Sequence, residues 1–121
     1  MKIAISATGK ELNSLLDSRF GRCEYFQIHD SENDKYNIIE NEGLTSSGGA
    51  GIVAAQQLID EGVDIVITGS LGPNAYNIIK KAKIKSFKCE NIEIEHVLEK
   101  FYDNKLEEIV SAGESHKGMS N

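Results

Sequence analysis

The sequence has little of several features that mark other classes of protein. Its 121 residues include only two cysteines, Cys23 and Cys89, and neither lies in a CxxC or CxxH pair. A disulfide framework is therefore not expected. No apolar run reaches the length of a membrane span, and residues 1–5 are too short and wrongly flanked for a signal peptide. These absences predict a cytoplasmic chain with reduced thiols and no membrane contact, and the length of 121 residues predicts one domain.

Positive charge is scarce and uneven. Thirteen Lys and Arg residues stand against nineteen Asp and Glu, which gives a formal net charge of −6. A protein that binds a phosphate backbone generally needs a basic face, so nucleic acid is not an expected partner. The only two arginines, Arg19 and Arg22, lie next to Cys23. Many of the lysines gather in one later stretch: Lys80, Lys81, Lys83, Lys85 and Lys88.

Two glycine-led stretches each run into a helix-like pattern. Ser46–Gly51 precedes an apolar run of helical period, and Gly69–Ala75 follows the strand-like residues 64–68, with Pro73 suited to a first helical position. Free backbone N–H groups and the positive end of a helix favour an anion at such places. The alternative is that these glycines serve only tight turns. Neither stretch has the Gly-Lys-Ser/Thr ending of a phosphate-binding loop.

The apolar patterns predict alternating strands and helices. We expect strands at 2–6, 25–29, 36–40, 64–68 and 85–88, and helices at 50–61, 73–82 and 92–102. Residues 10–22 are expected to form a loop, 106–110 a short edge segment, and 111–121 a flexible tail after a single domain over 1–110. The β-α-β-α order of the second half requires parallel strands.

Four ordered blocks resemble a known family. Ser18–Phe26, Gly48–Gln56, Gly62–Gly69 and Gly72–Ala75 are similar to the dinitrogenase iron–molybdenum cofactor biosynthesis domain, and the resemblance covers about residues 1–110. That family includes NifX, NafY, the C-terminal region of NifB and many stand-alone proteins of archaea and anaerobic bacteria. The resemblance implies a ribonuclease H-like, three-layer α/β fold. Its sheet would be mixed and five-stranded, in the order 3-2-1-4-5 with strand 2 antiparallel, and flanked by helices.

The same resemblance implies a role in binding and carrying metal–sulfur clusters. The cargo would be an iron–sulfur or molybdenum-containing cluster or its precursor, exchanged with donor or acceptor proteins; one stand-alone relative is known as a molybdenum–copper–sulfide protein. Nitrogenase-associated carriers often have histidine where this chain has Arg19, so the chain looks like the stand-alone branch. A ribonuclease H-type nuclease needs a carboxylate on the first strand, and residues 2–6 have none. No other catalytic motif stands out, so a non-catalytic protein is expected.

In the implied topology, the strand ends bring both glycine-led stretches and the arginines to one edge of the sheet. The candidate cluster-binding residues are Arg19, Phe20, Gly21, Arg22, Cys23, Gly48, Gly49, Gly51, Gly69, Gly72 and Asn74. Cys23 is also the candidate metal ligand, since an adjacent arginine and a helix start would favour its thiolate. Alternatively, Cys23 is a small buried residue and the arginines pair with carboxylates. The alternative function is a module that binds a small anion without metal or has a regulatory role. A third and weaker alternative is an enzyme that uses Cys23 as its nucleophile.

The remaining cysteine and the histidines carry less information. Strands 2 and 5 lie roughly 14 Å apart at about 4.8 Å per step, so a Cys23–Cys89 disulfide is not expected. Cys89 is therefore interpreted as structural. His29, His96 and His116 are expected to be solvated, with His29 on the sheet face opposite Phe26 and Ile28.

Overall fold

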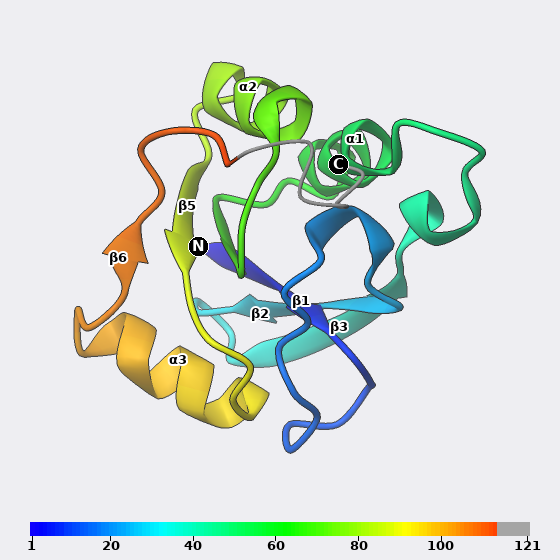
Figure 1. Cartoon of the computed structure of the whole chain (residues 1–121). Helices are drawn as coiled ribbons and strands as arrows, with labels where there is room; N and C mark the ends of the chain where they lie inside the picture. Colours follow the sequence, from blue (N-terminus) through cyan, green and yellow to red (C-terminus); the bar gives the residue numbers. More distant parts are fainter. Residues whose placement is uncertain (114–121) are drawn as a thin grey trace.

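The protein folds as a mixed α/β structure in which helices cover both faces of one sheet (Figure 1). The computed structural model describes residues 1–113. The strands are β1 (Lys2–Ala7), β2 (Tyr25–Asp30), β3 (Lys35–Glu40), β4 (Ile65–Thr68), β5 (Lys85–Lys88) and β6 (Glu107–Glu108). The helices are α1 (Ala50–Asp60), α2 (Pro73–Lys81) and α3 (Ile94–Tyr102), joined by the 3-10 turns η1 (Phe20–Arg22) and η2 (Glu42–Thr45).

The sheet has the strand order β3-β2-β1-β4-β5-β6. β1 pairs in parallel with β4, and β4 with β5, whereas β2 runs antiparallel to both of its neighbours. The predicted order of the first five strands and the reversed direction of strand 2 are thus confirmed. The predicted count of five is wrong, because Glu107–Glu108 pairs with the end of β5 as a sixth strand. This strand lies in the short edge segment expected at 106–110, although its two exposed glutamates have no apolar alternation that would mark a strand of the sheet. The ribonuclease H-like label stays a prediction.

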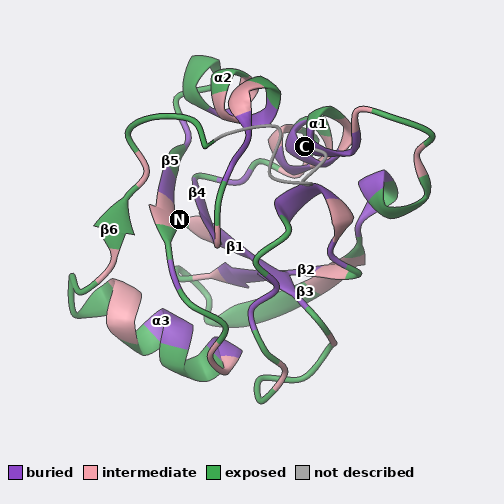
Figure 2. Cartoon of the chain, in the orientation of Figure 1, coloured by how far each residue is buried: buried purple, intermediate pink, exposed green. Residues whose placement is uncertain are grey.

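The core lies in two layers, one on each face of the sheet (Figure 2). Successive side chains of a strand point to opposite faces, so Ala4 faces α1 and α2 whereas Ile3 and Ile5 face α3. β1 lies at the centre of the sheet, and Ile3 to Ala7 are all buried, as expected for a strand covered on both faces. Burial of these side chains holds the C-terminal end of β1 in place, and the candidate site begins at that end.

Most predicted boundaries agree with the structure to within two residues. The helix predicted at 92–102 begins at Ile94 instead, because Glu93 is extended and forms a bridge with Leu15 of the long first connection. That connection lacks a helix as predicted, apart from the single turn η1 at its end. The long loop is therefore tied to the sheet end by backbone bonds.

The C-terminal segment leaves the sheet and returns toward the second glycine-led stretch. The Gly113 N–H donates to the Leu71 carbonyl over 2.7 Å. Most of the predicted flexible tail, residues 114–121, lies outside the described residues, and the domain boundary at residue 110 stays a prediction.

Across residues 1–113, no helix combines the length and apolar character needed to cross a membrane.

Candidate functional site

One end of the sheet collects three segments that are distant in sequence. We call this end the rim and define it as Ser18–Cys23, Ser46–Ala50 and Gly69–Asn74. A backbone bridge joins Arg19 to Ser70, and η1 packs against both α1 and η2. The structure thus brings the arginine segment and both glycine-led stretches together.

Close backbone contacts hold the rim together and account for two of its glycines. A Cβ at Gly21 would lie 2.7 Å from the Gly51 nitrogen, and a Cβ at Gly69 would lie 2.5 Å from the Ser18 Cβ. Only glycine fits such approaches without a shift of backbone. Gly48 differs, because nothing lies within 4 Å of the place its Cβ would occupy. Gly21 and Gly69 are therefore packing residues, whereas Gly48 has open space around it.

Both helices that start at the rim lack a side-chain cap. Gly49, in the left-handed conformation with φ 64°, precedes α1, and Gly72 precedes α2 with Pro73 as its first residue. Because both N-cap residues are glycines, neither offers a side-chain oxygen to the N–H groups of the first turn. Such N–H groups give each helix a partial positive charge there. Asn74, at the start of α2, is exposed and available to an incoming group.

Arg19 is paired with a carboxylate that the sequence analysis did not single out. Its Nη2 lies 3.0 Å from Asp17 Oδ2 and its Nε 3.2 Å from Oδ1, and its backbone N–H donates to the same Oδ1 over 2.9 Å. The Asp17 side chain is 8% exposed, whereas that of Arg19 is 56% exposed. The hydrogen bonds and charge of Asp17 raise the pKa of Arg19. The guanidinium thus neutralises a buried carboxylate and presents its outer edge to solvent.

Arg22 holds the loop that leads into α1. Its Nη1 donates to the carbonyls of Gly43, Leu44 and Ser46, at 3.2, 3.0 and 3.1 Å. Three carbonyls on one nitrogen fix the position of this loop. The head group therefore lies at the first glycine-led stretch, as predicted, and acts there as a structural clamp.

Cys23 does not have the environment that was expected. Its side chain is fully buried in the α1/α2 layer of the core, as is the neighbouring Phe20, whose ring packs on Phe26 at 5.4 Å. Burial, with a smaller contribution from the charge of Asp17, raises the pKa of the Cys23 thiol to about 12. The prediction of a favoured thiolate is therefore wrong, because loss of water outweighs the hydrogen bonds from the backbone and from Asn41 that favour the thiolate.

A family profile described as dinitrogenase iron-molybdenum cofactor matches residues 1–104. The chain belongs to this family. The match spans the whole rim and every helix of the fold.

Two relatives are similar to this member of the dinitrogenase iron-molybdenum cofactor family over nearly their full length. An uncharacterized protein of Methanocaldococcus jannaschii, MJ0580, is 34% identical over 110 residues, which cover 88% of this chain and 90% of that protein. The apo form of the orange protein from Desulfovibrio gigas superposes with a TM-score of 0.88 at 31% identity, covering 93% of this chain and 96% of the other. Sequence family and fold therefore agree.

Asn41 is a second residue of this family member that the sequence analysis missed. Its buried amide nitrogen donates to the carbonyls of Gly21 and Cys23, at 3.0 and 2.9 Å, and its Oδ1 accepts the N–H of Gly43 over 2.9 Å. It thereby joins η1 to η2 beneath the rim. An asparagine after a strand is an ordinary turn signal, so the sequence offers no sign of these distant partners.

The three histidines lie away from the rim or outside the described residues. His96 is exposed on α3, as predicted. His29 is on the predicted face, but its expected solvation is wrong: it is buried, stacks on Tyr36 at 4.5 Å and bonds Asp34 over 2.9 Å. His116 lies outside the described residues.

Both thiols should be inert in the folded protein. Cys23 and Cys89 are buried and free, which confirms that no disulfide joins them, and burial raises the pKa of both. At about pH 8 we expect dithionitrobenzoate to react far more slowly with the native protein than with the protein in denaturant, because thiolate is the reactive form. Raising the pH should speed the native reaction. Rapid native labelling of one thiol, located by mass spectrometry on Cys23, would contradict its burial.

Proposed function

We propose that this protein binds and carries an anionic metal–sulfur cluster, or a precursor of one, at the rim, and exchanges it with donor and acceptor proteins. Membership of the dinitrogenase iron-molybdenum cofactor family supports this class of cargo. The observation that carries the proposal is the convergence of two helix starts without side-chain caps and two arginines at one end of the sheet. The three rim segments contain two arginines and no carboxylate, so together with Asp17, the partner of Arg19, they have a net charge of +1 in a chain whose net charge is −6.

The rim suits the outer surface of a cluster better than it suits a metal ion. Sulfides of such a cluster accept hydrogen bonds, and backbone N–H groups and guanidinium supply them. The soft ligand expected from the sequence is a buried thiol, which would have to lose its proton and reach the surface to bind metal. We therefore assign Cys23 a packing role and propose that hydrogen bonds and charge hold the cargo.

Tetrathiomolybdate is a suitable probe, because it is a soluble thiometallate anion. Under anaerobic conditions we expect it to bind the protein and to bind Arg19→Gln about tenfold more weakly, the effect of one lost charge-assisted contact. Lys105→Gln, which removes the same charge from an exposed site after α3, should bind like the unchanged protein. Cys23→Ser should also retain binding. Isothermal titration and molybdenum analysis after gel filtration measure these affinities.

The same titrations decide against the proposal if tetrathiomolybdate fails to bind, or if Arg19→Gln and Lys105→Gln weaken binding equally. The burial of Cys23 favours one other candidate, a metal-free module for a small anion, because no soft ligand is then needed. Titration of the protein with inorganic phosphate tests this alternative. Phosphate binding that depends on Arg19, without thiomolybdate binding, would establish that alternative.

A further inference from the structure

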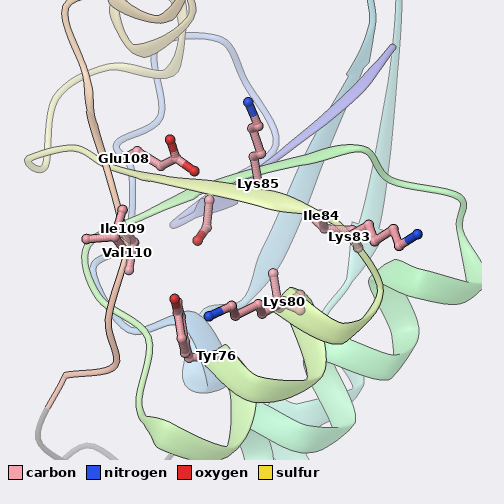
Figure 3. A pocket seen from close by; sticks show the side chains of 10 residues that line it. Tyr76, Lys80, Lys83, Ile84, Lys85, Glu108, Ile109 and Val110 are labelled. Atoms are coloured by element: carbon pink, nitrogen blue, oxygen red, sulfur yellow. The ribbon is translucent and has the colours of Figure 1, made fainter.

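A cavity lies beside α2 and β5, apart from the rim. Its volume is about 400 Å³, and it opens between α2, the start of β5 and residues 108–110 (Figure 3). This volume is within the range of sites for small molecules. The rim, by contrast, lies where the parallel strands end. Nothing in the proposed cluster function uses this cavity.

The cavity has an apolar floor with one cationic side chain beside it. Its apolar lining consists of Ile79, Ile84, Ile109 and Val110. Figure 3 shows Lys80 and Tyr76 next to one another at the cavity, and the Lys80 Nζ lies 5.8 Å from the centre of the Tyr76 ring. Lys83 and Lys85 also line the cavity, but their side chains extend away from it. Lys80 is thus the charge nearest to a bound molecule.

The positive charge here is not neutralised by partners. Within residues 1–113, no salt bridge involves Lys80, Lys83 or Lys85. The only acidic lining residue is Glu108, whose register opposite Phe87 directs it to the α3 face. The carbonyls of Ile78, Ile79 and Lys80 at the end of α2 accept backbone N–H groups of the turn that follows. A local excess of positive charge in an acidic chain favours an anion.

Ser86 supplies a second polar group. Alternation along β5 places it on the α2 face, where it lines the cavity, and only 3% of the residue is exposed. Its carbonyl accepts the Ile109 N–H over 2.8 Å, which holds the segment with Ile109 and Val110 beside β5. A serine hydroxyl can donate a hydrogen bond to an acceptor on a bound molecule.

We propose that this cavity binds a small organic anion, with its charged head at Lys80 and Ser86 and its apolar body on the isoleucines and Val110. Val110 supports this assignment, because 73% of this β-branched residue is exposed at the mouth of the cavity. A ligand that covers Val110 gains apolar burial, which an inorganic cluster would not supply. The inference is independent of the proposed cluster function.

Anilinonaphthalene sulfonate, an aromatic anion, and N-phenylnaphthylamine, its uncharged analogue, test this site by fluorescence titration. We expect the sulfonate to bind the native protein, and Lys80→Ala to weaken that binding about tenfold while Lys81→Ala, one residue along α2 and outside the lining, leaves it unchanged. Ser86→Ala should weaken it about threefold, and excess tetrathiomolybdate should not displace the dye.

Three results would overturn the assignment. These are the absence of sulfonate binding, equal weakening by Lys80→Ala and Lys81→Ala, and equally tight binding of the uncharged analogue. Both lysines lie on the outer surface of α2, so neither variant should unfold the protein. Circular dichroism on each variant confirms that a lost signal reflects lost binding.

Discussion

Gly21→Ala should lower the free energy of unfolding by about 3 kcal/mol, as expected for forced overpacking of backbone against backbone. The added Cβ would lie 2.7 Å from the Gly51 nitrogen and 3.0 Å from the Ala50 carbonyl carbon. Neither neighbour is the movable end of a side chain, so η1 or the first turn of α1 has to shift. Urea unfolding followed by circular dichroism measures the change in free energy.

Gly48→Ala is the matched control for this prediction. Gly48 lies in the loop before α1, and nothing lies within 4 Å of the position that the added methyl group would take. Its unfolding free energy should stay within about 0.5 kcal/mol of the original, the usual range for a surface change. Equal stabilities of Gly21→Ala and Gly48→Ala would mean that the close approach of η1 to α1 is absent in solution.

The two variants also separate packing from binding at the rim. If the shift of η1 spreads the rim, Gly21→Ala should lose tetrathiomolybdate binding even at temperatures where it is folded. Gly48→Ala should be fully folded. If this variant binds tetrathiomolybdate more weakly, the cause is therefore a contact between the bound anion and the loop before α1. The glycines Gly21 and Gly48 of the rim thus have different roles, which their place in the sequence alone does not reveal.

The order of elements was accessible from the sequence because apolar patterns respond directly to burial. β1, β2 and β4 have the apolar content of strands covered by helices, and α3 has an apolar face of helical period. A short edge segment was expected at 106–110, but its pairing with β5 as a sixth strand was not, since the two exposed glutamates of β6 have no pattern of their own. Whether a short segment at the edge of a sheet forms a strand depends on its pairing with the neighbouring strand.

The convergence of the three rim segments was predicted correctly, but the environment of their residues was not predictable from neighbours in the chain. Cys23 stands between Arg22 and Glu24, which suggests a polar environment. In the fold, its side chain points into the core while those of its neighbours do not. Asp17 was missed for a related reason. Its importance comes from burial beside Arg19, and burial of a carboxylate is set by tertiary packing.

Asn41→Ala should be at least as destabilising as Gly21→Ala, with an expected loss of about 3 to 5 kcal/mol. The change removes four side-chain hydrogen bonds at once, the longest of them 3.6 Å to Cys23 Sγ, and leaves the carbonyls of Gly21 and Cys23 and the N–H of Gly43 without this partner. Each buried group left unpaired costs about 1–3 kcal/mol, less where water can enter. Denaturant unfolding gives the loss.

Asn77→Ala, on the surface of α2, is the control for the loss of an asparagine and should leave stability nearly unchanged or slightly raised, since alanine is the better helix former. Asn41→Asp separates the contribution of the two carbonyl hydrogen bonds from that of the bond to the Gly43 N–H. Aspartate keeps an oxygen for the Gly43 N–H but has no N–H to give the two carbonyls, so it should not restore stability. If Asn41→Asp were as stable as the original protein, the carbonyl bonds would contribute little, and the rim would depend mainly on its glycine contacts.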